Sequence, residues 1–311
     1  LNDELISIQE DLLSGTYQLS EIYPIGFPKS PNESGPRTRQ IFWISIRDQV
    51  TWLAVVNIIG PELDYKMPFW SYGNRLFLSI WYDEIEENNR KKLKPKFGWY
   101  RNTAGNIYRK WNQSWPLYRR CISITAKIMA NKFKENASMS VEDIRDVREQ
   151  DTFEQNMDYP PHLMNKYLFD NYWDKKLSGE IYWCGIDLEK FYPSLKTEKI
   201  LENFINNLQA AKSDQKLIDL LNRLLAFQIN TDLWDQSELK EIQLENNLHN
   251  KIINFPGIPT GLLVAGFLAN VAMLEVDELV KKELEKRKNI AHYRFVDDHV
   301  ILSDDFNDLL E

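Results

Sequence analysis

Hydrophobic and polar positions alternate with a helical period over most of the first part of the chain. Apolar spacing predicts a helix within the first 20 residues that ends at Ser14–Gly15, because glycine commonly follows the last turn of a helix. Residues 26–40 are rich in Pro, Ser and Gly and predict a loop. A second helix is predicted over 47–59, and Gly60–Pro61 is expected to end it.

The second part of the chain changes from helical to strand-like patterns. Residues from about 77 to 178 predict helices joined by polar connections. The run 181–186 is short and apolar on both faces, which is typical of a buried strand. Further on, the pattern predicts helices over 198–209, 215–228 and 262–288, a loop over 257–261 and a hairpin over 292–302.

Composition bounds the class of protein. A chain of 311 residues with 43% hydrophobic content can bury a substantial core and form two domains or one large one. No apolar run approaches the roughly 20 residues that a bilayer requires, and no signal segment opens the sequence. Cys121 and Cys184 stand far apart, which argues against a disulfide framework and a structural zinc site. We expect a soluble cytoplasmic protein.

The net charge of −8 conceals a basic segment. No Asp or Glu occurs between Arg90 and Lys134, and aromatic residues such as Trp111 and Trp115 stand among its basic residues. Basic grooves with stacking rings hold single-stranded or structured nucleic acid. A solvated basic face that keeps the molecule soluble would have the same composition. The candidate nucleic-acid contacts in this segment are Lys94, Lys96, Arg101, Arg109, Lys110, Arg119 and Arg120.

Three carboxylates stand at the ends of predicted strands. In HYRFVDDHVIL, Asp297 and Asp298 are adjacent at a hairpin tip, where aspartate is common as a turn residue. Two like charges at contact distance are costly unless a cation neutralises them, so a metal site is the other interpretation. Asp187, in the stretch CGIDLEKFYPSL, stands at the C-terminal end of the predicted strand over 181–186. A lone aspartate at such a position would most often cap a helix.

Two further features each have two interpretations. The loop GIPTG, 257–261, has glycines that would let its backbone approach a ligand closely. Ala265, Ala269 and Ala272 follow it on one predicted helix face, which would contact either a nucleic-acid backbone or, as a core helix, a sheet. The histidines show no metal-ligand spacing, and His299 is expected at a strand surface.

The order of these blocks resembles the reverse transcriptases. DLEKFYPSL resembles their first catalytic palm motif, GIPTG resembles the motif that cradles nucleotide and template, and FVDD is similar to their aromatic-x-Asp-Asp signature. Upstream, RQIFWISIRDQV resembles the arginine-led fingers block and PFWSYGNRL the Ser-Tyr-Gly-x-Arg block of retron-type and group II intron enzymes. The resemblance covers about residues 35–302.

This resemblance implies an α+β right-hand polymerase with fingers and palm. The fingers would comprise 1–178, including a large basic helical insertion over about 77–178, and the palm 179–311. The palm would be an antiparallel sheet with helices on one face, and the thumb is expected outside this chain.

The resemblance also implies an RNA-directed DNA polymerase, a nucleotidyltransferase that uses two Mg²⁺ ions, with Mn²⁺ as an alternative. It assigns catalysis and metal binding to Asp187, Asp297 and Asp298, with the Leu188 main chain as a further ligand. Tyr192 would screen the sugar and Arg39 would bind the triphosphate. The other nucleotide-binding candidates are Arg37, Lys29, Leu188, Phe191, Thr260 and Gly261, and Ser71 and Arg75 would contact nucleic acid.

Some motif positions differ from many relatives. The chain most resembles bacterial abortive-infection and other defence-associated reverse transcriptases in three features. These are the long insertion, Thr260 in place of Gln, and Ala265–Gly266 in place of Ser-Pro. The implied partners are dNTPs, an RNA template or non-coding RNA and a DNA product, in the bacterial cytoplasm, without a membrane; a homo-oligomer is also compatible. Three alternatives stay open: a template-independent or protein-primed polymerase, a retron or intron enzyme, and a non-catalytic nucleic-acid-binding scaffold.

Overall fold

The computed structural model describes residues 1–32, 35–68, 70–87, 90–100, 107–129, 181–212, 214–232, 252–287 and 289–310. Its contacts divide the chain into two compact units, each built from two stretches of sequence. Unit 1 comprises Leu1–Lys66 and Glu189–Glu275, and unit 2 comprises Met67–Leu188 and Val276–Glu311. None of the helices in the described part of the chain combines the length and apolar character needed to span a membrane.

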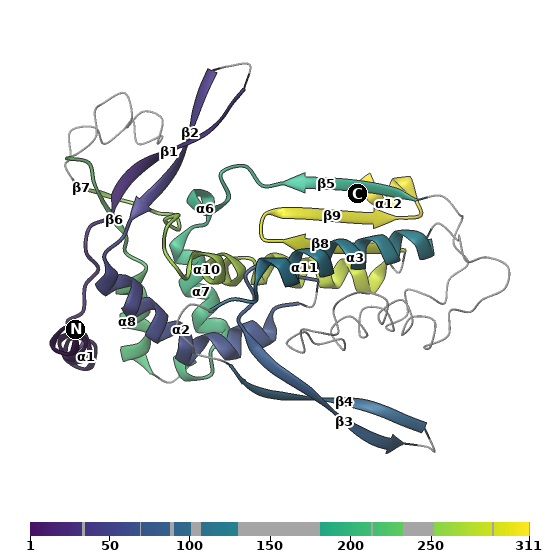
Figure 1. The fold of residues 1–311 in the computed structure, drawn as a ribbon, viewed down its shortest axis with the longest axis horizontal. Coiled ribbons are helices and arrows are strands. Elements are labelled where there is room, and N and C mark those ends of the chain that lie inside the picture. Colours follow the sequence, from purple (N-terminus) through teal and green to yellow (C-terminus); the bar gives the residue numbers. More distant parts are fainter. Residues whose placement is uncertain are drawn as a thin grey trace. The chain divides into compact units, whose positions relative to one another are not determined.

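Unit 1 begins with a helix, a hairpin and a long helix (Figure 1). Helix α1, Asn2–Ser14, ends as predicted at Gly15, which takes the left-handed conformation with φ 74°. Strands β1, Tyr23–Asn32, and β2, Gly35–Trp43, then pair antiparallel. The predicted loop over 26–40 is therefore wrong. Prolines misled the prediction, because both strands of a two-stranded hairpin have an open edge where a missing N–H is tolerated.

Helix α2, Ile46–Lys66, continues through Pro61, so the predicted end at Gly60–Pro61 is also wrong. Its buried face extends beyond the proline to Leu63 and Asp64. Packing of an apolar face outweighs local propensity in such a helix. Sequence reasoning placed the boundary by the proline and underestimated this burial.

The second stretch of unit 1 forms small helices and short strands. The predicted helices over 198–209 and 215–228 are confirmed as α7, Thr197–Asn207, and α8, Gln215–Leu224. The remaining elements are α6, Phe191–Ser194, a 3₁₀ turn, Ala210–Lys212, β6, Gln228–Asn230, β7, Ile252–Asn254, and α10, Ala265–Ala272.

The predicted long helix over 262–288 is two helices. Helix α10 ends at Met273, and α11, Leu274–Lys286, follows. The buried Asn203 amide donates to the carbonyls of Val271 and Ala272 at 3.0 and 3.4 Å, which satisfies acceptors at the end of α10. Almost every α10 side chain is buried, which confirms the core-helix interpretation of this segment.

Unit 2 is built around a three-stranded antiparallel sheet in the order β5-β9-β8 (Figure 1). Strand β5 is Tyr182–Asp187, and β8, Ile290–Phe295, and β9, Asp298–Ser303, form the predicted hairpin. Strand β5 is an exposed edge with Trp183 70% exposed, so the expectation of a buried strand is wrong. A short helix, α12, Phe306–Leu310, follows the sheet.

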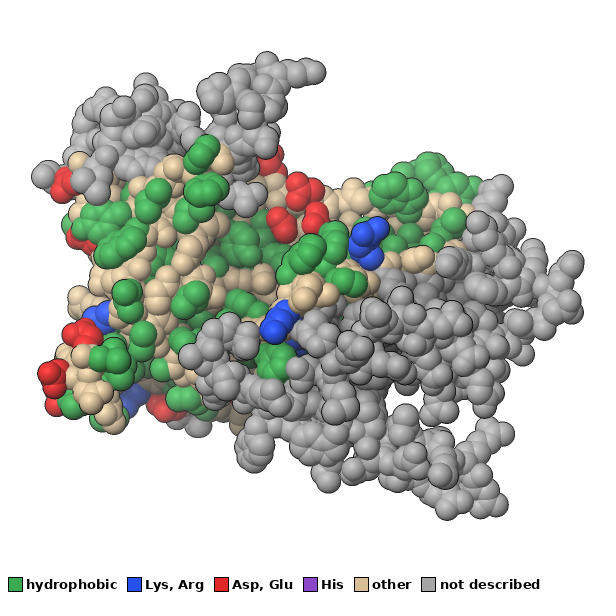
Figure 2. Space-filling view, in the orientation of Figure 1, with side chains coloured by type: hydrophobic (Ala, Val, Ile, Leu, Met, Phe, Trp, Pro, Cys, Tyr) green, Lys and Arg blue, Asp and Glu red, His purple; other side chains and the backbone are tan. Residues whose placement is uncertain are grey.

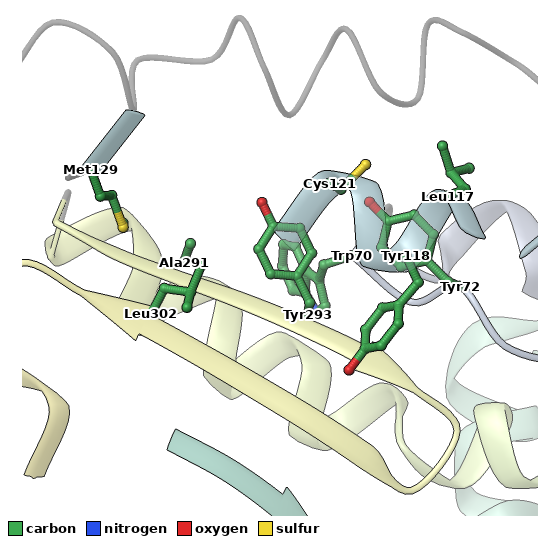
Figure 3. Close-up of a cluster of buried hydrophobic side chains, with 9 residues drawn as sticks. All are labelled: Trp70, Tyr72, Leu117, Tyr118, Cys121, Met129, Ala291, Tyr293 and Leu302. Atoms are coloured by element: carbon green, nitrogen blue, oxygen red, sulfur yellow. The ribbon is translucent and has the colours of Figure 1, made fainter. Parts of the chain in front are cut away.

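A cluster of buried side chains joins the sheet to helix α3, Trp111–Met129 (Figure 3). Ala291, Tyr293 and Leu302 face α3. Arg294, the residue after Tyr293 in β8, instead donates a hydrogen bond to Asp277 of α11. Because successive side chains of a strand point to opposite faces, helices cover both faces of β8. The expectation of helices on one face is therefore corrected.

Part of the predicted helical insertion is a β-hairpin. Strands β3, Leu78–Glu87, and β4, Arg90–Tyr100, pair antiparallel with Asp83 opposite Lys94 and Glu86 opposite Lys91. Opposite charges at opposed positions stabilise such a hairpin, and their mirrored order along the chain was a signal that the helical prediction missed. Helix α3 confirms helix over 111–129, whereas residues 130–180 lie outside the described part of the chain.

Candidate active site

Three aspartates come together at one end of the unit 2 sheet. Asp187 is the last residue of β5 and lies opposite Asp298, the first residue of β9. Asp297 stands in the two-residue connection between β8 and β9, where Phe295 pairs with Asp298. Asp187 and Asp298 are exposed and Asp297 is half-buried. The register therefore brings together the three aspartates that the resemblance grouped, and their catalytic and metal-binding roles stay a prediction.

The three carboxylates repel one another. Partial burial raises the pKa of Asp298 above its ordinary value, and the negative charges of Asp297 and Asp187 raise it further. Within the described ranges no group of three His, Cys, Asp or Glu side chains is arranged to bind a metal ion. The donor set still fits one, because carboxylate oxygens suit Mg²⁺ and a cation would remove this repulsion.

The turn between the two strands is strained. Val296 has a φ of 64°, a left-handed conformation that a β-branched residue rarely adopts. Gly73 lies against it, since a Cβ on Gly73 would come within 2.5 Å of the Val296 Cγ2 atom and 2.9 Å of its nitrogen. Such strain persists when the surroundings fix the backbone, and it clusters at functional sites.

A buried ion pair holds strand β8 next to this turn. Arg294, fully buried, donates from Nε to Asp277 Oδ1 at 2.9 Å and from Nη2 to Asp277 Oδ2 at 2.6 Å. The Trp70 indole also donates to Asp277, at 3.4 Å. The backbone of Arg294 bonds to Trp70 O and Tyr72 N, at 2.9 and 3.0 Å. Sequence reasoning missed this pair, although an arginine at an inward position of an apolar strand was a signal.

His292 and His299 form a second buried contact on the same hairpin. His292 Nε2 lies 2.9 Å from His299 Nδ1, and the side chains are 4% and 9% exposed. The expectation of His299 at a strand surface is wrong. Burial lowers the pKa of His292 to about 3 and that of His299 to about 4, and the Arg294 charge contributes to both. Both rings are therefore neutral near pH 7.

Helix α3 brings aromatic rings to the hairpin. Trp115 and Tyr118 contact the Phe295 ring, with centroids 5.0 and 5.7 Å apart. Burial raises the pKa of Tyr118 far above its ordinary value, and the charge of Asp298 adds to this effect. The Tyr118 hydroxyl therefore stays neutral beside the carboxylates.

The predicted nucleic-acid contacts fall on different elements. Lys110, immediately before α3, and Arg119, within α3, are exposed. Arg109 is half-buried, and Lys94 and Lys96 lie on β4. Arg101 and the side chain of Arg120 lie outside the described part of the chain.

Ser71 and Arg75 are buried, with 1% and 4% exposure. Arg75 Nη1 donates to the carbonyls of Pro68 and Ser71 at 3.0 and 3.3 Å. The structure thus gives Arg75 a role in holding the 68–75 segment. Direct contact of these two side chains with nucleic acid stays a prediction.

In unit 1, the GIPTG loop contacts two of the predicted nucleotide-binding segments. Ile258 N donates to Tyr192 O at 2.9 Å, and a Cβ on Gly257 would lie 2.4 Å from Pro193 O. On its other side, Thr260 O accepts from Phe42 N at 2.7 Å. Gly261 has a φ of 113°, and a Cβ there would lie 2.3 Å from Phe42 O. Glycine is required at both positions because of these close backbone approaches.

The predicted phosphate-binding residues lie on the β1–β2 hairpin that ends near this loop. Lys29 pairs with Arg37, and Phe27 pairs with Arg39. Helix α6 begins with Phe191, buried, and Tyr192, half-buried, after Lys190 in a left-handed conformation. Unit 1 therefore brings together the segments of Arg39, Tyr192 and Thr260. Leu188, one residue after Asp187, is the last residue of the first stretch of unit 2.

Comparison with known families identifies the class of protein. The model of the family described as "Reverse transcriptase (RNA-dependent DNA polymerase)" matches residues 117–311. The chain belongs to the reverse transcriptase family. A comparison with curated protein sequences gave no match.

Two solved telomerase structures show a distant likeness. The apo telomerase from Candida tropicalis, truncated from its C-terminal domain, is 13% identical, with 92% of this chain and 54% of that chain covered and a TM-score of 0.27. The telomerase from Candida albicans in complex with the TWJ fragment of telomeric RNA is 10% identical, with 94% and 45% covered and a TM-score of 0.32. This chain spans about half the length of each.

Proposed function

We propose that this chain is an RNA-directed DNA polymerase that adds dNTPs to a 3′-hydroxyl. The observation that carries the proposal is the cross-strand pairing of Asp187 with Asp298, with Asp297 in the adjoining turn. Partial burial and then the charges of Asp297 and Asp187 raise the pKa of Asp298, and a divalent cation would relieve both the burial cost and the repulsion.

In this proposal Asp187 and Asp297 hold two Mg²⁺ ions, with Mn²⁺ as a substitute, while Asp298 and the Leu188 carbonyl complete the site. Such ions lower the pKa of an attacking hydroxyl and stabilise a leaving pyrophosphate. The 3′-oxygen forms a bond to the α-phosphorus of the dNTP, and the bond from that phosphorus to pyrophosphate breaks. Tyr118, neutral beside Asp298, adds no charge to the site.

The dNTP would be held by the segments that unit 1 gathers. Arg39 makes a bidentate phosphate contact that lysine could not reproduce, and Arg37 and Lys29 lie nearby on the same hairpin. Tyr192 stacks under the sugar and excludes a 2′-hydroxyl. We therefore expect Tyr192→Ala to incorporate ribonucleotides more readily than the parent. Unchanged sugar discrimination would remove Tyr192 from this role.

We further propose an RNA template or partner RNA, a DNA product and a role in bacterial antiviral defence, in the cytoplasm. The long interval between SYGNRL and Asp187, together with Thr260 and Ala265–Gly266, supports the defence-associated subgroup. A phage-infection assay with the wild type and an Asp297→Asn/Asp298→Asn variant tests this role. Equal protection by both would contradict a role that depends on polymerisation.

Incorporation of labelled dNTPs in Mg²⁺ tests the polymerase itself. The Asp297→Asn/Asp298→Asn variant should lose at least about 100-fold of activity, since loss of one electrostatic stabiliser alone costs about 10²–10³. Asp219→Asn, on an exposed face of α8, is the matched control and should keep activity. Product that needs the aspartates and vanishes after RNase treatment supports RNA templating. RNase-resistant product favours untemplated or protein-primed synthesis, and no product at all favours a binding scaffold.

A further inference from the structure

Helix α3 presents two tryptophans and an arginine along one line, which we call the α3 stripe: Trp111, Trp115 and Arg119. Their spacing of four residues places them on one face of the helix. The Trp111 and Trp115 rings stack with centroids 6.0 Å apart and an interplanar angle of 14°. Trp115 is half-buried, whereas Trp111 is 64% exposed, so the outer face of the stack is open to solvent.

The inner end of the stripe is fixed to the catalytic hairpin. Trp115 meets the Phe295 ring edge-on, with centroids 5.0 Å apart and an interplanar angle of 89°. Phe295 in turn pairs across the turn with Asp298. A continuous series of ring contacts therefore leads from beside the carboxylates to the exposed Trp111. Its inner rings are held by packing, so the outer indole is supported on one side by a rigid neighbour.

The charge around the stripe suits a phosphate backbone. Lys110, immediately before Trp111, and Arg119 are both exposed, and neither forms an ion pair with the residues that the structure describes. Figure 2 shows positive side chains beside hydrophobic ones over this part of the molecule. On β4, Lys91 and Lys94 lie opposite Glu86 and Asp83 of β3 in the strand register. At α3, Lys110 and Arg119 place exposed positive charge at the two ends of the α3 stripe.

An exposed, stacked indole flanked by cations matches the chemistry of single-stranded nucleic acid, whose bases stack on aromatic faces and whose phosphates attract basic residues. The occupant follows from the position of the stripe. The strand whose 3′ end is extended at Asp187 and Asp297 has its last nucleotides close to Phe295. That strand, rather than a distant partner, is the one that the ring contacts can reach.

We propose that the α3 stripe is a stacking site for a base near the 3′ end of the growing DNA strand, with Lys110 and Arg119 contacting its phosphates. The proposal rests on the proposed polymerase function, and it adds the site that holds the product strand. Stacking on an aromatic side chain tolerates every base, so the site has no sequence preference.

Binding of a fluorescein-labelled, single-stranded DNA 12-mer of mixed sequence to the whole chain tests the site. The measurement uses EDTA and no dNTP, so that it is independent of catalysis, and an RNA of the same sequence is the second arm. Trp111→Ala should weaken DNA binding about 5- to 150-fold, the effect of losing one base stack. Trp111→Phe retains a ring and should stay within about threefold of the wild type.

Tyr65→Ala is the matched control. Tyr65 is 73% exposed on α2. Its neighbour Lys66 is paired with Glu62 at 3.6 Å, so this ring stands beside a compensated charge and its loss should not alter affinity. Lys110→Ala and Arg119→Ala should each reduce the slope of log affinity against log salt by about one.

An affinity of Trp111→Ala equal to the wild type, or an equal loss in Tyr65→Ala, would overturn the stacking site. A Trp111-dependent affinity that is stronger for RNA than for DNA would overturn the choice of the growing strand. A different result would contradict the polymerase proposal: a wild type that binds DNA through Trp111 but incorporates no dNTP.

Discussion

Removing one partner of the Asp277–Arg294 pair should destabilise unit 2 more than any surface ion pair would. Both side chains are almost fully buried, with 0% exposure for Arg294 and 4% for Asp277, and two hydrogen bonds of 2.9 and 2.6 Å join them. Asp277→Leu would leave the guanidinium buried without its counter-charge. It would also remove the acceptor of the Trp70 indole.

The expected cost follows from desolvation. Breaking a buried pair by removing one partner costs about 3–5 kcal/mol, because the remaining charge loses its compensation. Replacing both partners with apolar residues of similar size is often nearly neutral. We therefore expect Asp277→Leu and Arg294→Met each to lower the free energy of unfolding by about 3–5 kcal/mol, and the double variant to recover most of it.

Urea denaturation of the wild type, both single variants and the double variant measures this coupling. Glu202→Gln is the control, since the Lys199–Glu202 pair of α7 is 55% exposed on each side and solvent screening should leave it little effect on stability. Single variants that cost no more than Glu202→Gln would refute the argument. So would a double variant whose loss equals the sum of the single losses, because the two side chains would then be energetically independent.

Three further outcomes are expected. Gly73→Ala should lower the free energy of unfolding by about 1–3 kcal/mol in urea denaturation, because its Cβ would overlap Val296; a loss below about 0.3 kcal/mol would contradict this contact. Gly261→Ala should cost about as much, through its φ of 113° and the Phe42 carbonyl, and a thermal shift within error of zero would disprove it. Between about pH 6 and pH 4 the free energy of unfolding should fall by about 2–3 kcal/mol per pH unit, since the unfolded chain protonates histidines that stay neutral when folded; His292→Gln should reduce this slope, and an unchanged slope would exclude the pair as its cause.

The carboxylate cluster could be predicted from the sequence because the order of its motifs resembles that of the reverse transcriptases. A strand that ends in Asp187 and a hairpin whose tip carries Asp297 and Asp298 need only pair in one sheet for the three groups to meet. Apolar periodicity also defined α7 and α8 within a few residues. The two helix predictions required no knowledge of distant contacts.

Other features depended on contacts that the local pattern does not contain. Pro61 was expected to end a helix, but burial of Leu63 and Asp64 extends α2 past it. His299 was expected at a strand surface because it stands beside Asp298. Its ring instead packs on His292, which only the pairing of β8 with β9 brings within 2.9 Å.

The turn between β8 and β9, which carries Asp297 and Asp298, is stabilised by contacts on both faces of the sheet. Asp297 and Asp298 stand beside a turn that holds Val296 in a left-handed conformation, and the charge of Asp187 opposes ionisation of Asp298. Strain and repulsion both favour opening of this turn. The buried Asp277–Arg294 pair stabilises the hairpin from one face of the sheet and the rings of α3 from the other. These supports lie in unit 2 itself, so the carboxylates are held in register by the fold. In the proposed function, a cation would therefore relieve the repulsion among them without having to assemble the site.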